Sequence, residues 1–188
     1  MALILAKGQS NRLSSKNTLD FHGKPMFLVN VKKCQQIFDS VYVSSDSTDI
    51  LFQAQEAGAI PILRGERLCG ETPNIPVYQH ALKYMPDDVK GIVAVQSNSP
   101  TIKKEIIEKV AKYIEAGAGE AMTCYEDGRI YGSVWAINKD KLLNYGDPYN
   151  PKPDFLVKDS SIDIHTLGDY NQALKEYNNI YEEIVSNS

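Results

Sequence analysis

The sequence predicts an α/β fold in which helices cover both faces of a mainly parallel central sheet, a three-layer, Rossmann-like arrangement. Two observations support this prediction. Short apolar runs alternate along the chain with longer segments of helical periodicity, which is the pattern of repeated βαβ units. The first run, 2–6, is apolar throughout, as expected for a strand buried on both faces of a sheet.

Each element follows from a local pattern. Strands are expected where short apolar or β-branched runs occur between turn residues, at 2–6, 41–44, 59–63, 91–95, 121–125 and 131–138. Helices are expected where apolar residues recur at helical spacing, at 25–37, 46–57, 75–85, 102–116, 139–145 and 169–185. The segment 146–153 holds three prolines and a glycine and is predicted to be a loop.

Length and composition limit the classes of protein. The 188 residues show no repeat and no linker, so we expect a single domain over 1–188. The net charge of −4 argues against nucleic acid or an anionic membrane as partner. No apolar run is long enough for a signal peptide or a membrane span. The three cysteines are scattered and predict reduced thiols in a cytoplasmic protein.

A polar loop, Lys7 to Asn17, follows the first strand, where an open α/β sheet places its ligand. Gly8 allows a tight turn, and Ser10 offers a hydroxyl. Lys7, Arg12 and Lys16 supply the positive charge that a polyphosphate needs. The loop has neither the Walker A pattern nor GxGxxG. From these residues alone, an anion-binding loop and an ordinary solvated surface loop are equally compatible with the sequence.

The wider pattern resembles a known family. The segment 6–17, followed by Gly23-Lys-Pro25, is similar without a gap to the opening of the acylneuraminate cytidylyltransferases (CMP-sialic acid synthetases), A-R-G-G-S-K-x-x-x-x-K-N and then G-K-P. Further similarities follow in the same order, at 43–46, 58–64, Leu68, Glu71-Thr72, 95–100, 161–165 and Asp169. The resemblance covers most of the chain and implies a three-layer nucleotidyltransferase fold.

The resemblance implies a reaction in which an acceptor oxygen attacks the α-phosphorus of CTP and pyrophosphate leaves. Lys16, with Lys7 and Asp163, is then catalytic, because Lys16 offsets charge on the departing phosphates. Lys7 stands where the family has Arg, so it keeps the charge and loses bidentate geometry. The nucleotide-binding set is Ala6, Lys7, Gly8, Ser10, Lys16, Asn17 and Arg64, with Arg64 contacting the base or ribose or lying as a surface arginine.

Metal and acceptor contacts also follow from the resemblance. An NTP substrate needs a divalent cation, here Mg²⁺, and Asp163 matches the first acidic residue of the family's terminal D-I-D. His165 occupies the position of the second and is a poor Mg²⁺ ligand, so either Asp163 alone holds the metal or the site differs and Asp163 is an ordinary polar residue at a strand end. Asp169 is expected to cap the last helix. Asp46 follows the carboxyl end of the second strand and either faces the site or caps the next helix, and capping is the favoured role. Of the acceptor-binding residues, Gln96 follows from the resemblance. Asn74 is a loop residue that touches the ribose or acceptor or has a capping role, and Arg129 is a nearby partner for an anion.

The chain is shorter than the family between Glu120 and Asn138, where family members carry an arginine-bearing excursion. A shorter pocket indicates a small acidic acceptor, such as a sugar acid, a phosphonate or a phosphorylated small molecule. The family forms dimers, so a homodimer is implied, although the segment that contributes to its interface is short here. Two alternatives stay open. One is transfer from another NTP to a sugar phosphate. The other is a nucleotide-binding protein without catalysis, which is compatible with His165 in place of an acidic residue.

Overall fold

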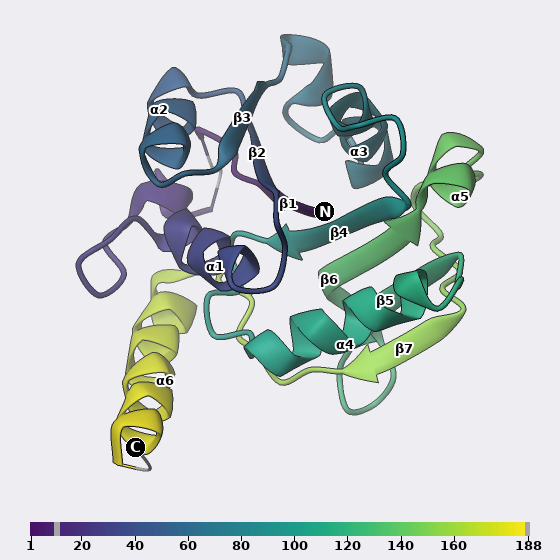
Figure 1. The fold of residues 1–188 in the computed structure, drawn as a ribbon. Coiled ribbons are helices and arrows are strands. Elements are labelled where there is room, and N and C mark those ends of the chain that lie inside the picture. Colours follow the sequence, from purple (N-terminus) through teal and green to yellow (C-terminus); the bar gives the residue numbers. More distant parts are fainter. Residues whose placement is uncertain (10–11, 187–188) are drawn as a thin grey trace.

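The computed structural model describes residues 1–9 and 12–186, with side chains described through residue 178. Its centre is a seven-stranded sheet in the order β3-β2-β1-β4-β6-β5-β7 (Figure 1). The strands are β1 (Ala2–Leu5), β2 (Val41–Ser45), β3 (Ile60–Leu63), β4 (Gly91–Gln96), β5 (Glu120–Cys124), β6 (Ile130–Asn138) and β7 (Phe155–Lys158).

The sheet is mainly parallel, as predicted. β1 pairs in parallel with both β2 and β4, β2 with β3, and β5 with β7. β6 runs antiparallel to its two neighbours, β4 and β5. The order of strands reverses direction at β1, which lies between β2 and β4, and a ligand crevice is expected at the carboxyl ends of strands at such a point.

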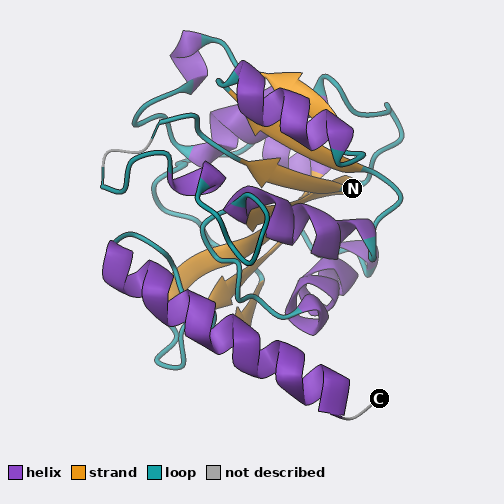
Figure 2. Cartoon of the chain, turned by 90° about the vertical axis from the view of Figure 1, so that its left-hand side faces the viewer, coloured by secondary structure: helices purple, strands orange, loops and turns teal. Residues whose placement is uncertain are grey.

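Helices cover both faces of the sheet, which confirms the three-layer arrangement (Figure 2). The alternation of side chains along each strand divides the core in two, as in β1, where Ala2 and Ile4 face one layer and Leu3 faces the other. The first layer contains α1 (Met26–Gln35), α2 (Thr48–Glu56) and α4 (Lys104–Glu115). The second contains α3 (Asn74–Leu82) and α5 (Lys139–Leu143).

The last helix, α6 (Leu167–Ser186), lies outside these layers. Its first turns pack with Ala173 against Phe21, Met26 and Val29, at the start of α1, and its far end extends away from the sheet (Figures 1 and 2). A capping box closes its N-terminus, because the Asp169 carboxylate accepts from the Thr166 amide at 2.8 Å and the Asp169 amide donates to the Thr166 hydroxyl. No helix within the described residues is long and apolar enough to cross a bilayer.

The structure agrees with one expected helix cap, differs at another, and contains a strand that was not expected. The capping role of Asp169 is confirmed, whereas Ser47, not Asp46, caps α2 by accepting from the Ile50 amide. β7 was not expected, because it follows a proline-rich loop and lies at the sheet edge with two of its apolar residues exposed. Short 3-10 turns at Lys16–Thr18 and Glu66–Leu68 shape the two loops that border the crevice.

Candidate active site

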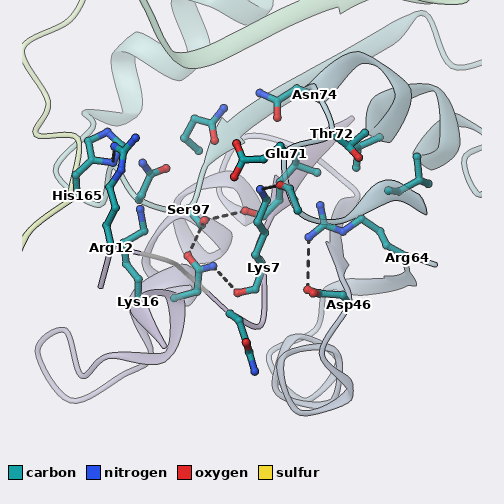
Figure 3. A pocket seen from close by; sticks show the side chains of 18 residues that line it. Lys7, Arg12, Lys16, Asp46, Arg64, Glu71, Thr72, Asn74, Ser97 and His165 are labelled. Carbon is teal, nitrogen blue, oxygen red and sulfur yellow. Dashed lines mark hydrogen bonds and ion pairs between the residues drawn. The ribbon is translucent and has the colours of Figure 1, made fainter. Parts of the chain in front are cut away.

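A pocket of about 500 Å³ opens at the carboxyl ends of β1 and β4, where the topology predicts it (Figure 3). Its wall combines the loop after β1, the segment between β3 and α3, the end of β4 and the segment before α6. The lining residues are Leu5, Lys7, Gln9, Arg12, Lys16, Asn17, Asp46, Arg64, Leu68, Gly70, Glu71, Thr72, Asn74, Val77, Gln96, Ser97, Asn98 and His165.

Asn17 fixes the shape of the loop after β1. It is 5% exposed, and its amide nitrogen donates to the Lys7 carbonyl at 2.8 Å. The Ser97 hydroxyl lies 2.8 Å from the Asn17 amide oxygen and 2.8 Å from the Leu5 carbonyl oxygen, so its single proton serves one acceptor at a time. The loop is therefore tied to the ends of both β1 and β4, and Asn17 holds the loop closed over this edge of the sheet.

Hydrogen bonds from Asn30 on α1 fix the backbone at the end of β4 and in the segment that follows it. The Asn30 side chain is fully buried, and its amide nitrogen donates to the carbonyls of Gln96 at 2.8 Å and Ser99 at 3.0 Å. The Ser99 hydroxyl in turn bonds the Tyr131 hydroxyl on β6. These bonds fix the backbone from which Gln96 and Asn98 extend into the pocket.

Asp46 lies at the site rather than on α2. Its carboxylate accepts from the Gly8 amide at 2.8 Å and lies 3.8 Å from the Arg64 guanidinium. Gly8 approaches α2 so closely that an added Cβ would lie 2.8 Å from the Ser47 Cβ. Only glycine fits this approach without a shift, so Gly8 and Asp46 together set the distance between the loop and Arg64.

Arg64 is the most unusual charged group in the pocket wall. Its side chain is 1% exposed, and burial lowers the pKa of its guanidinium, with Asp46 acting in the opposite direction. Two of its nitrogens, Nε and Nη2, have no hydrogen-bond partner, since Asp46 lies beyond hydrogen-bonding distance. Buried donors without partners are costly, and because both atoms are shielded from the surface, a ligand with acceptor atoms would satisfy them only after a shift of the pocket wall.

Two lysines of the loop bond to backbone carbonyls on opposite sides of the pocket. The Lys7 ammonium donates to Gly70 in the segment between β3 and α3. The Lys16 ammonium donates to the Ile164 carbonyl at 2.7 Å. Burial lowers the pKa of Lys16, while the charge of Asp163 opposes that shift. Both lysines carry a charge that no described carboxylate neutralises by direct contact, and an anion in the pocket would do so.

The segment before α6 forms a chain of side-chain contacts with the loop after β1. The Asp163 carboxylate accepts from the Asn98 amide and lies 2.6 Å from His165 Nε2. His165 Nδ1 lies 3.1 Å from an Arg12 nitrogen, and Figure 3 shows the two side chains side by side at the pocket edge. Asp163 itself does not line the pocket, although both of its partners do.

The donor set for a divalent cation is small. Among the described side chains, no three His, Cys, Asp or Glu residues gather closely enough to hold a metal ion. Asp163 offers one carboxylate, 21% exposed and held by Asn98 and His165, as metal-binding carboxylates commonly are. One carboxylate together with phosphate oxygens and water is an arrangement that Mg²⁺ accepts, so the site fits a nucleotide-bound cation but lacks a second acidic ligand.

The structure brings together six of the predicted site residues in the pocket wall: Lys7, Lys16, Asn17, Arg64, Asn74 and Gln96. Ala6 is buried, and Gly8 supports the loop through Asp46 without lining the pocket. Ser10 lies outside the described residues. Arg129 lies away from the pocket, in the exposed turn between β5 and β6, where it pairs with Asp127 at 2.7 Å.

Sequence reasoning missed Asn98 and the partnership of Arg12 with His165. Asn98 follows β4 two residues after Gln96, and its position at a strand end was the available signal. Arg12 was assigned only a general positive charge. Its contact with His165 joins residues 153 positions apart, which no local pattern reveals.

The fold and the pocket define a class, an α/β protein whose loop after the first strand lines a pocket with cationic side chains. The model of the cytidylyltransferase family matches residues 1–148, so the chain belongs to the cytidylyltransferase family. The resemblance seen in the sequence is thereby confirmed at the level of the family.

Curated relatives transfer CMP to sugar acids. The chain is 34% identical over 116 residues to the 3-deoxy-manno-octulosonate cytidylyltransferase of Erwinia tasmaniensis, a match that covers 61% of this chain and 46% of the relative. It is 28% identical over 123 residues to the pseudaminic acid cytidylyltransferase of Campylobacter jejuni, covering 61% and 53%. These matches span about half the length of the relatives.

Solved structures share the fold over almost the whole chain. A CMP:2-keto-3-deoxy-manno-octonic acid synthetase complexed with CTP has a TM-score of 0.73 at 15% identity, covering 93% of this chain and 96% of that one. Rv0371c of Mycobacterium tuberculosis, in complex with manganese, has a TM-score of 0.67 at 16% identity, covering 93% and 97%. At these identities the likeness concerns the fold.

Proposed function

We propose that this protein transfers CMP from CTP to a small acidic acceptor and releases pyrophosphate. The observation that carries the proposal is Arg64, whose side chain lines the pocket and has two buried nitrogens without a partner, which a small shift toward a bound base would satisfy. Cytosine presents acceptor atoms at O2 and N3, whereas uracil carries a hydrogen at N3. A donor placed opposite N3 therefore accepts cytosine and rejects uracil, because uracil would leave two donors facing each other.

The loop after β1 suits the triphosphate. Lys7, Arg12 and Lys16 line the same pocket and have no direct carboxylate partner among the described residues. In the proposed reaction an acceptor oxygen forms a bond to the α-phosphorus, and the bond to the bridging oxygen of pyrophosphate breaks. Negative charge grows on the leaving group, and Lys16 stabilises it.

Mg²⁺ is the proposed cation, supported by the manganese complex of a structural neighbour and by the Asp163 carboxylate. Asp163 would hold it together with phosphate oxygens and water. When bound, the cation supplies neutralisation of phosphate charge. In this proposal Asn98 and His165 orient the Asp163 carboxylate, and Lys16 binds the departing phosphates.

The acceptor lies, on this proposal, beside Asn74 and Gln96, which line the pocket with side chains suited to hydroxyl groups. The named relatives use sugar acids, and that class is the first choice for the acceptor. Arg129 was predicted to hold the acid group but does not line the pocket, so an acidic group has to be bound by another cation.

We also propose that the chain works as one domain in the cytoplasm. β7, beyond the segment that the family model matches, completes the same sheet, and α6 packs at the start of α1. The three cysteines are free, as expected in a reducing compartment. A homodimer remains part of the proposal on the strength of the family resemblance.

The test is pyrophosphate release. The protein is incubated with each of CTP, UTP, ATP and GTP, with Mg²⁺ and a panel of sugar acids, phosphonates and phosphorylated small molecules. The proposal expects release with CTP and at least one acidic acceptor, and a CMP-linked product by mass spectrometry. Release with another NTP and a sugar phosphate would overturn it, and CTP binding without release with any acceptor would favour a nucleotide-binding protein.

A further inference from the structure

The position of a second acidic residue in the family pattern is taken here by His165, and the structure shows what it contacts. His165 Nδ1 lies 3.1 Å from Arg12 Nη1, and its Nε2 lies 2.6 Å from the Asp163 carboxylate. A guanidinium can only donate, so Nδ1 accepts the bond from Arg12. Nε2 therefore carries the hydrogen and donates it to Asp163, which fixes one tautomer of the ring.

The imidazole is thus held from two directions. Asp163 is held in turn by the Asn98 amide, and the His165 backbone amide donates to the Asp169 carboxylate at 3.0 Å, at the capped start of α6. A ring restrained at both nitrogens and at its backbone offers a fixed acceptor to Arg12. The contact spans the pocket edge between the loop after β1 and the segment before α6 (Figure 3).

The consequence is electrostatic. His165 orients Arg12 without neutralising it, because the accepting nitrogen carries no negative charge. No described carboxylate pairs with Arg12. An aspartate at position 165 would pair with the guanidinium and cancel its charge, and it would also place a second carboxylate beside Asp163. One residue therefore decides whether this edge of the pocket favours a phosphate or a cation.

We propose that His165 is a positioning residue that directs the charge of Arg12 toward the phosphates of the nucleotide, and that the chain consequently binds a triphosphate with little dependence on a divalent cation. The inference rests on the proposed function only in taking a triphosphate as the ligand. It adds that Arg12 supplies, at this edge, positive charge that a cation held by two carboxylates would otherwise supply.

The test measures binding of inorganic tripolyphosphate by isothermal titration calorimetry, with EDTA and then with Mg²⁺. Wild-type protein is expected to bind in both conditions with affinities within about threefold. Arg12→Ala should weaken binding in EDTA by about tenfold, which is the loss of one charge-assisted contact. His165→Asp should weaken binding in EDTA by a similar factor and recover most of it in Mg²⁺, because the new carboxylate adds a second acidic ligand beside Asp163.

Two further variants separate positioning from general damage. His165→Gln keeps an acceptor for Arg12 and a donor for Asp163, and it should bind tripolyphosphate nearly as well as wild type. Arg129→Ala is the matched control, since Arg129 is an exposed arginine outside the pocket, and it should leave binding unchanged.

The inference fails if Arg12→Ala binds tripolyphosphate in EDTA as tightly as wild type, or if wild-type binding collapses without Mg²⁺. It also fails if His165→Asp behaves alike in the two conditions. Tripolyphosphate carries no base and undergoes no CMP transfer, so these outcomes are independent of the preference for CTP. Far-ultraviolet circular dichroism confirms that each variant is folded before its binding is compared.

Discussion

Lys16 joins a structural role to a predicted catalytic one. The side chain is half-buried, and its ammonium donates to the Ile164 carbonyl. Burial lowers its pKa below the ordinary value for lysine. The positive charge of Lys16 should therefore be lost at a lower pH than that of an exposed lysine.

Lys16→Ala should reduce turnover by about 10²-fold or more, because a charge that stabilises the leaving group is removed. It should lower the free energy of unfolding by only about 1 kcal/mol, the contribution of one hydrogen bond. Pyrophosphate release and urea unfolding measure the two effects, with the exposed Lys104→Ala as control. Equal losses of activity and stability, or no loss of activity, would show that Lys16 has only a structural role.

Lys33 gives a prediction about pH that concerns stability alone. Burial lowers its pKa to about 8, and its ammonium donates to the carbonyls of Pro100 and Ile102. Unfolded lysine keeps its proton to higher pH, so above pH 8 the unfolded state binds more protons than the folded state. Stability contributed by this group therefore rises with pH across that window.

Lys33→Met removes this dependence while keeping the length of the side chain. The free energy of unfolding of wild type, relative to the variant, should rise by about 1 kcal/mol between pH 7.5 and 9. Cys34, whose pKa burial raises to about 12, contributes the opposite slope, and the charge of Lys33 lowers that pKa. Both proteins in the comparison therefore also carry Cys34→Ala, which removes the thiol titration. A flat or falling difference in urea unfolding would contradict the assignment.

At the scale of elements, the loop after β1 depends on its close approach to α2. The Gly8 amide donates to Asp46, and a Cβ at Gly8 would lie 2.8 Å from the Ser47 Cβ. Backbone and side chain here have little room to move, because Ser47 is the N-cap of α2. The loop and the helix are therefore fitted to each other, and Asp46 connects both to Arg64.

Gly8→Ala should cost about 1–3 kcal/mol of stability, as overpacking does in a close contact, and should weaken CTP binding by displacing the loop. Gly65→Ala provides the matched control, because a Cβ at Gly65 would meet nothing within 4 Å and its φ is negative. Urea unfolding and CTP titration compare the two variants. If both alanines have equal effects, the close approach does not determine the position of the loop.

Local sequence patterns predicted most of the helices and strands, but not β7 and not the role of Asp46. The strands and helices through residue 145 were predicted because their apolar periodicity is strong and their ends carry turn residues. β7 could not be predicted, since it follows the proline-rich loop and its pairing with β5 joins segments far apart in sequence. The role of Asp46 was wrong for a related reason: Asp46 and Ser47 both offer a cap, and only the distant Gly8 and Arg64 show which residue is free for the site.

For the whole molecule, the fold brings together at one edge of the sheet residues that come from segments throughout the sequence. The reversal of strand order at β1 places the loop after β1, the end of β4 and the segment before α6 around one pocket. The sequence indicated part of the wall of this pocket, because Lys7, Lys16 and Arg64 follow strands or lie in the first loop. It misplaced Arg129, since the length of the turn between β5 and β6 does not reveal where its side chain points.

The measurement that tests the central claim most directly is nucleotide selectivity in thermal unfolding, with CTP, UTP, ATP and GTP compared for wild type and for Arg64→Met. Wild type should be stabilised by CTP more than by the other three, in proportion to its tighter binding. Arg64→Met, of similar length and without donors, should retain the part of the shift due to phosphate and lose the preference for CTP over UTP. Equal stabilisation of wild type by all four nucleotides would contradict the assignment of this pocket to CTP.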